Sequence, residues 1–168
     1  GLYNEKIDSI HVWEYASFSQ YNKSDTINIY ADKFISYLNS NDRIFICYNN
    51  SVIDGNLMQG DCDSIFYNKT DSLLKFIKEP VVWIDKNQIS GENIEFKAFE
   101  GQIFNMNVSN NSMIISKKDS IHFDQIKGNN IYGYFEKNDL KILDVNNNGQ
   151  AIYYTLDESD SLINEINN

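Results

Sequence analysis

Proline, arginine and histidine are scarce in this chain. Its 168 residues include one proline, Pro80, one arginine, Arg43, and two histidines. A single proline leaves strands free to run long and pair continuously, because proline lacks the N–H that a sheet ladder needs. The formal net charge is −10 and the lysines are scattered, so the chain lacks the basic face that neutralises phosphates. We therefore predict that nucleic acid is not a partner.

Long hydrophobic runs and cysteines are also few. No apolar run approaches the roughly 20 residues of a transmembrane helix, and no export signal opens the chain. We expect the chain to be a segment of a longer repeat protein whose export signal lies outside it. Cys47 and Cys62 stand one strand and one turn apart, which allows a cross-strand disulfide or two free buried thiols. The free thiols are the favoured arrangement.

The common catalytic and metal-binding motifs are missing. His11 and His122 each lie in a strand-like segment without a second ligand at metal-binding spacing. The sequence contains no nucleophile elbow, zinc-protease helix, P-loop or dinucleotide fingerprint. We therefore predict a protein that is not an enzyme, with no catalytic residue, no metal site and no cofactor.

Acidic residues leave one enzymatic alternative open. Asp32, Asp61 and Glu92 recur after a small residue at matched positions. Parallel β-helices that cleave polysaccharides place acidic clusters along one face, so a lyase or hydrolase is a third hypothesis for this chain. The favoured interpretation is structural, because an acidic residue directly after a turn can accept hydrogen bonds from backbone N–H groups.

What the sequence does contain is an internal repeat. A small residue followed by an acid or amide precedes an apolar run four times, with steps of 29, 31 and 37 residues. Periods near thirty residues are typical of stacked architectures, in which each unit buries its apolar face against its neighbours. The four repeated pairs, predicted to be turns, are Ala31-Asp32, Gly60-Asp61, Gly91-Glu92 and Gly128-Asn129.

The local chemistry of the repeat favours β-structure. The apolar runs are short, rich in Ile, Val, Phe and Tyr, and often alternate with polar residues, as in Ile94–Ala98. We predict an all-β protein of strands of about five to eight residues in a single β-repeat domain over residues 1–168. Asp160–Ile166 is the one candidate for a short helix, within a tail at 159–168 that could equally be frayed. The predicted turn centres are Ser40-Asn41, Asp54-Gly55, Asn110-Asn111 and Asn147–Gly149.

The succession of motifs resembles a known family. Four segments carry the resemblance: Gln88–Ile94, Asp124–Phe135, Leu140–Val145 and Gly149–Tyr154. They resemble the OstA-like family, relatives of the LptA periplasmic lipopolysaccharide-transport protein, whose repeat joins two apolar strands through a short polar turn. The resemblance implies a twisted, open β-jellyroll, or β-taco, with two facing sheets.

The same resemblance implies a function. It predicts a non-enzymatic periplasmic bridge protein that binds lipopolysaccharide, or its lipid A moiety, and shields the acyl chains between two sheets. It also implies end-to-end self-association, or pairing with other transport proteins, through exposed edge strands. The runner-up is a structural or adhesive β-repeat module that binds another protein.

Alternation along the strands assigns an interior face. Its residues would contact lipid or form an ordinary core, since burying an apolar side chain is worth about 1.5–3 kcal/mol either way. The predicted interior, lipid-contacting residues are Ile29, Phe34, Ile46, Val81, Trp83, Ile94, Phe96, Phe104, Met106, Met113, Ile115, Ile131, Phe135, Ile142 and Tyr153.

Overall fold

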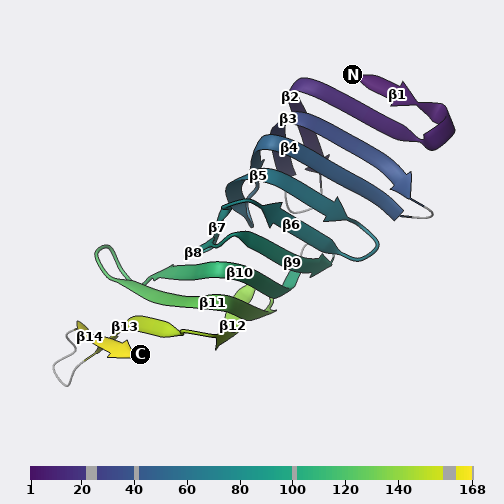
Figure 1. Ribbon diagram of the computed structural model, residues 1–168. Helices are drawn as coiled ribbons and strands as arrows, with labels where there is room; N and C mark the ends of the chain where they lie inside the picture. The colour runs from purple at the N-terminus through teal and green to yellow at the C-terminus, as the bar shows by residue number, and fades with distance from the viewer. Residues whose placement is uncertain (22–25, 40–41, 100–101, 157–161, 168) are drawn as a thin grey trace.

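The protein is built from antiparallel strands that stack in chain order. The computed structural model covers residues 1–168 and describes residues 1–21, 26–39, 42–99, 102–156 and 162–167. Within these ranges all regular structure is β-strand, apart from a 3-10 turn, η1, at Glu5–Ile7. The all-β prediction is therefore confirmed, and Figure 1 shows the strands following one another from the N-terminus to the C-terminus.

The strand bounds are as follows: β1 Leu2–Asn4, β2 Ser9–Tyr21, β3 Thr26–Asn39, β4 Asp42–Asp54, β5 Gln59–Asn68, β6 Leu73–Ile77, β7 Val81–Ile84, β8 Asn87–Ser90, β9 Asn93–Phe99, β10 Gln102–Lys117, β11 Phe123–Glu136, β12 Asp139–Asn146, β13 Gln150–Leu156 and β14 Leu162–Asn167.

Several strands are longer than the sequence predicted. β2, β3, β4, β10 and β11 each contain 13 to 16 residues. Their ladders shift register near the middle, for example between Ser109 and Ser112 of β10. Such bulges bend a strand without ending it. Asn110-Asn111, predicted to be a turn centre, is therefore a bend inside β10.

Pairs of residues with positive φ mark these bends at regular intervals. Their φ angles lie between 51° and 64°, in the left-handed region that asparagine tolerates better than most residues. The spacing of the pairs corresponds to the period of about thirty residues predicted from the sequence. The five pairs at the bends are Glu14-Tyr15, Asn49-Asn50, Lys78-Glu79, Asn110-Asn111 and Asn147-Asn148, and a sixth pair, Lys137-Asn138, lies in the turn between β11 and β12.

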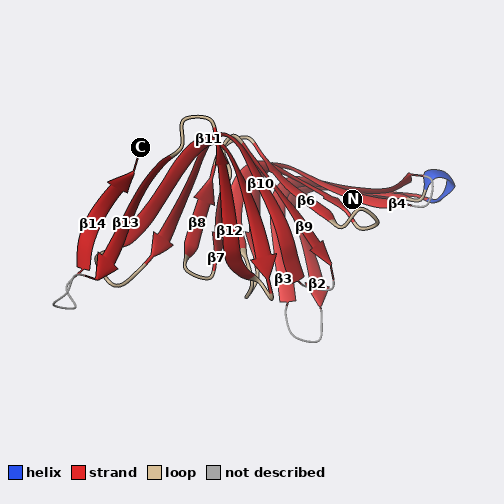
Figure 2. Cartoon of the chain, turned by 90° about the horizontal axis from the view of Figure 1, so that it is seen from below, coloured by secondary structure: helices blue, strands red, loops and turns tan. Residues whose placement is uncertain are grey.

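The bends divide the strands between two walls, which meet along one crease. Wall 1 contains β6, β9 and β12. It also contains one half of each bent strand, β2 to β5, β10 and β11, namely the half on the same side of the bend as β6, β9 and β12. Wall 2 contains β7, β8, β13, β14 and the other halves of the bent strands. Figure 2 shows the strands spreading away from one ridge.

The prediction of an open β-taco is wrong for the centre of the molecule. There the pairing runs β5-β6-β9-β10-β8-β7 and returns to β5, which closes a ring of six antiparallel strands. The ring closes because β5 and β10 bend and contribute to both walls. Further strands continue the sheet on either side of the ring, from β4 to β1 and from β11 to β14.

The interior of the ring is a packed core. Phe76, Val82, Ile89, Ile94 and Phe96 have no exposed surface. The rings of Phe76 and Phe96 meet edge to face with centroids 6.0 Å apart, a favourable arrangement for aromatic pairs. Side chains from both walls therefore fill the space between β5 and β10.

Four other local predictions are corrected. The pairs Ala31-Asp32 and Gly128-Asn129 do not reverse the chain, because they lie within β3 and β11, close to the crease. Gly60-Asp61 likewise lies within β5. The helix predicted over Asp160–Ile166 is wrong for the described part of that segment, where β14 pairs with β13. Ser40-Asn41 lies outside the described residues.

Candidate functional site

A cavity of about 860 Å³ lies between the walls in the N-terminal half of the protein. Wall 1 lines it with side chains of β3 to β6, β9 and β10, and wall 2 lines it with side chains of β2 to β4. Its volume falls in the range of about 300–1,000 Å³ found for small-molecule sites. The space between the walls is therefore hollow beside the ring and filled within it.

Aromatic side chains from both walls meet inside this cavity. Phe18 of wall 2 stacks on Phe34 of wall 1, with ring centroids 5.6 Å apart and an interplanar angle of 11°. Phe45 lies 5.5 Å from Phe18 and 5.9 Å from Tyr67, centroid to centroid. The contact between Phe18 and Phe34 shows that the two walls face one another here.

Aliphatic side chains complete the apolar surface. Ile27, Ile29 and Ile53 belong to wall 2, and Ile65 and Leu74 belong to wall 1. Such a surface offers dispersion and hydrophobic contacts to an apolar ligand, and it has few groups that could perform chemistry on one.

The loop between β4 and β5 also contributes apolar side chains. Leu57 and Met58 line the cavity, and Met58 is buried. The backbone N–H of Gly55 donates a hydrogen bond to the Met58 carbonyl at 3.0 Å, which closes the loop. The predicted turn at Asp54-Gly55 is thus present, and the loop covers one side of the cavity with apolar groups.

Polar groups occur where the lining strands reach their hairpin turns. We call Gln20, Asn56, Lys69, Ser72 and Asn138 the rim, since these polar residues line the cavity at the turn ends of the walls. Among the described lining residues Lys69 is the one with a formal charge. An apolar interior with a polar rim suits an amphipathic molecule with a long apolar part.

Both cysteines are free and buried, as the sequence analysis favoured. Cys47 lines the cavity. Burial, and secondarily the nearby Cys62, raise the pKa of Cys47 to about 12. Burial also raises the pKa of Cys62 to about 11. Both thiols are therefore protonated at neutral pH, so neither is an activated nucleophile.

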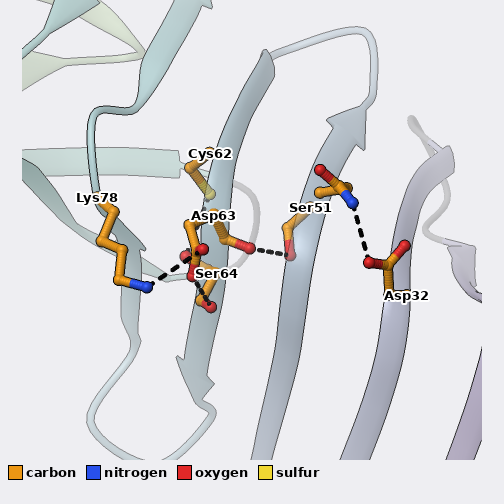
Figure 3. A network of polar contacts seen from close by, with 7 residues as sticks. Asp32, Ser51, Cys62, Asp63, Ser64 and Lys78 are labelled. Carbon is orange, nitrogen blue, oxygen red and sulfur yellow. Dashed lines mark hydrogen bonds and ion pairs between the residues drawn. The ribbon is translucent and has the colours of Figure 1, made fainter.

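A line of polar contacts joins neighbouring strands along the crease (Figure 3). Asn50 donates to a carboxylate oxygen of Asp32 at 2.9 Å, and Asn110 donates to Glu92 at 2.7 Å. These acids accept from side-chain amides, so the prediction that they bind backbone N–H groups is wrong for Asp32 and Glu92. The sequence matched Asp32, Asp61 and Glu92 by the small residue before each, whereas the structure places Asp32 and Glu92, but not Asp61, in these contacts at the bends.

Between these two contacts, Asp63 occupies the equivalent place on β5. It accepts hydrogen bonds from the Ser64 hydroxyl at 2.6 Å and from the Lys78 ammonium at 3.2 Å. The Ser64 bond and then the Lys78 contacts lower the pKa of the Asp63 carboxyl. The Ser51 hydroxyl donates to the Asp63 carbonyl at 3.1 Å. The charges of Asp63 and Lys78 are therefore paired with each other, and these contacts connect the strands at the bend.

Neither histidine belongs to a group of three or more metal-ligating side chains among the described residues. His122 Nδ1 lies 2.8 Å from an Asp119 carboxylate oxygen at the turn between β10 and β11. The described residues contain no group of three or more metal-ligating side chains. No described helix has the length and apolarity to cross a membrane.

The structure places eight of the fifteen predicted interior residues on the interior face. Ile29 and Phe34 line the cavity. Ile94, Phe96, Met106, Ile131 and Phe135 are buried in the core. Tyr153 lies two residues beyond Ala151, which pairs with the core-packed Ile126, so it shares the interior face and is half-buried.

The other seven lie on the opposite face, so their assignment to the interior is wrong. In each case the interior position is taken by a neighbour in the same apolar run, for example Val82 beside Val81 and Ile114 beside Met113. A run of consecutive apolar residues does not reveal which of its two phases faces inward. The seven residues are Ile46, Val81, Trp83, Phe104, Met113, Ile115 and Ile142.

Phe104 shows how a bulge changes the phase. The ladder between β9 and β10 shifts register between Ile103 and Asn105. Ile103 and Met106 both face inward as a result, although they are three positions apart, and Phe104 is 39% exposed. Strict alternation back from Met106 selects Phe104 in place of Ile103.

Sequence reasoning missed several cavity residues. Phe18 stands between two serines and was not assigned to the interior face. Phe45 and Tyr67 lie in phases that alternation left ambiguous, and Leu57-Met58 lies in a loop. The unusually high number of Phe and Tyr residues was the available signal for a lined groove.

No protein-family model and no curated protein sequence matches this chain. The resemblance to the OstA-like family therefore stays a hypothesis, and the geometry of the cavity has to carry the functional argument.

Proposed function

We propose that this protein binds the acyl part of a lipid in the cavity between its walls and carries it through water. The observation that carries the proposal is the contrast between the packed ring and the hollow beside it. Protein interiors are normally close-packed, and an apolar hollow of this size forgoes contacts that a ligand would supply. Each methylene group buried there contributes about 0.8 kcal/mol to binding.

The resemblance supplies the finer form of the proposal. It favours a periplasmic protein of lipopolysaccharide transport, which shields acyl chains and has no enzymatic activity. In this setting the packed ring favours a carrier with one cavity over a conduit along the whole interior. The runner-up, a structural or adhesive β-repeat module, would need no cavity.

Association between copies belongs to the same proposal. β1 and β14 end the strand order at opposite ends of the sheet, so each has one edge without a partner strand in the described residues. Edge strands can pair with another chain through their backbone groups. Sedimentation over a range of protein concentrations tests this, since a monomer at all concentrations would contradict it.

The central experiment fills the cavity. Ala98 lines it from β9, and its side chain is small, so an Ala98→Trp substitution places a large ring in the hollow. The matched control is Lys97→Trp, since Lys97 is the exposed neighbour on the other face of the same strand. We expect the wild type and Lys97→Trp to bind an acyl lipid, and Ala98→Trp to lose most of that binding while keeping its far-ultraviolet circular dichroism.

The readout is crosslinking of a photoreactive acyl probe, mapped by mass spectrometry. Adducts should fall on cavity residues such as Phe45 and Leu74 and should be competed by unlabelled lipid. Lipopolysaccharide is one competitor, and its failure alongside success of simpler lipids would remove that specific ligand. Absence of any saturable adduct in the wild type would overturn the proposal and favour the structural module. Fractionation of cells that express the full-length protein tests the periplasmic location.

A further inference from the structure

We propose that the ligand of this cavity is a fatty acid, and that its carboxylate binds at Lys69, Tyr67 and Ser72. This inference rests on the proposed function, since it names the head group and the number of chains that the same cavity accepts. It would replace lipopolysaccharide, a lipid with several chains and several phosphates, as the ligand of this cavity.

The three groups come from one hairpin, the one that joins β5 to β6. Ile65 and Tyr67 of β5 and Lys69 of the following turn occupy every second position, and all three line the cavity. Ser72 lines it from the far side of the turn. One hairpin that lines the cavity thus contains a phenol, an ammonium group and a hydroxyl, and all three can donate hydrogen bonds to a carboxylate.

The hairpin turn holds these donors in place. The side-chain amide oxygen, Oδ1, of Asn68 accepts hydrogen bonds from the backbone N–H groups of Thr70 at 2.9 Å and Asp71 at 3.3 Å. The Ser72 N–H donates to the Lys69 carbonyl at 3.2 Å, and the Ser72 carbonyl accepts from the Ala98 N–H at 2.9 Å. The turn is therefore tied both to itself and to β9.

The nearest acid in the turn has a partner of its own. The Asn68 amide donates to a carboxylate oxygen of Asp71 at 2.8 Å. Lys69 forms no ion pair with any described residue. The ammonium group of Lys69 is thus available to an incoming anion, which approaches from the cavity side.

The charge of the rim limits the head group. Gln20, Asn56, Ser72 and Asn138 are neutral, so Lys69 can balance about one negative charge. The chain as a whole carries a net charge of −10, which repels a head group with several charges. Tyr67 is half-buried, and burial raises the pKa of its hydroxyl, which therefore remains a donor.

The volume limits the number of chains. A cavity of about 150 Å³ accommodates benzene, with six heavy atoms, so 860 Å³ accommodates roughly 34 heavy atoms on the same scale. This content corresponds to one or two long acyl chains. Lipid A has more chains than this cavity can enclose.

Isothermal titration with palmitate, hexadecanol and lipopolysaccharide tests the inference on the full chain. Hexadecanol has the same chain length as palmitate and no charge. We expect palmitate to bind more tightly than hexadecanol, and lipopolysaccharide to bind more weakly than either. Lys69→Met should weaken palmitate binding roughly three- to tenfold and leave hexadecanol unchanged. Tyr67→Phe should weaken palmitate binding by a smaller factor.

The control variant is Lys97→Met, which removes a positive charge from the outer face of wall 1. It should leave all three affinities unchanged, whereas an effect equal to that of Lys69→Met would mean that only net charge matters. If palmitate and hexadecanol bind equally and Lys69→Met changes neither, the carboxylate site is overturned and the acyl cavity stands. If none of the three lipids binds the wild type, the proposed function itself fails. Tighter binding of lipopolysaccharide would overturn the single-charge inference.

Discussion

Truncation of two phenylalanines, Phe96 and Phe104, distinguishes the observed packing from simple alternation. Both were predicted to face inward. Phe96 has no exposed surface and packs edge to face against Phe76. Phe96→Ala should lower the free energy of unfolding by about 3–5 kcal/mol, because the closed ring restricts the collapse of the walls into the space left. Phe104 is 39% exposed, so Phe104→Ala should cost about 1 kcal/mol or less.

Equilibrium unfolding in urea, followed by circular dichroism, measures both losses. For an m value of about 2 kcal/mol/M, Phe96→Ala should lower the urea midpoint by about 2 M and leave the slope unchanged. A double-mutant cycle with Phe76→Ala should give a coupling of about 0.5–1.5 kcal/mol for the pair of rings. A loss for Phe104→Ala that equals or exceeds the loss for Phe96→Ala would refute the bulge at Ile103 and the packing derived from it.

Three further predictions concern the crease, the cavity and a turn. A Cβ at Gly128 would lie 2.5 Å from Cγ1 of Val145, so Gly128→Ala should lower the free energy of unfolding in urea by about 1–3 kcal/mol. If this clash is the cause, adding Val145→Ala should reduce the loss. The pKa of the Cys47 thiol is 9.0 in the unfolded chain and about 12 in the folded protein, so the free energy of unfolding should fall as pH rises above 9. In Cys47→Ala this fall should be less steep. Equal slopes in the two proteins from pH 8 to 10.5 would contradict the prediction. Hydrogen bonds from the N–H of Ile121, and then from His122, lower the pKa of Asp119 from 3.8 to about 2. The stability that the ionised Asp119 provides should therefore be lost as pH falls below 3.8. Asp119→Asn should remove part of that acid sensitivity in thermal melts.

The architecture followed from chemistry that is local in the sequence. Short alternating runs rich in Ile, Val, Phe and Tyr predicted an all-β protein, and the structure confirms it. The Asn-Asn pairs tolerate positive φ whichever fold surrounds them, so Asn110-Asn111 and Asn147-Asn148 could be predicted as places where the chain turns. Whether such a pair ends a strand or only bends it depends on the tertiary structure around it. Asn147-Asn148 separates two strands, whereas Asn110-Asn111 bends one strand and lets it continue.

The candidate site was predictable only in part, for the same reason. Ile29 was identified because Ile27–Ile29 alternates, whereas Phe34 stands beside Ile35 and alternation alone did not resolve its phase. The rim could not be found from the sequence, because Lys69 and Asn138 are distant in the chain and belong to separate hairpins. Adjacency of such residues depends on which strands pair across the sheet.

The sequence alone therefore determined the all-β class, the repeat period, the acidity and the positions where the backbone can bend, since each depends on the intrinsic preference of a few neighbouring residues. The tertiary structure decided which side of each apolar run faces inward, that β5 and β10 close a ring, and that a hollow remains beside it. These features depend on register and on the fit of side chains from two walls. A shift of one residue reverses a strand's faces at little cost to its local preferences.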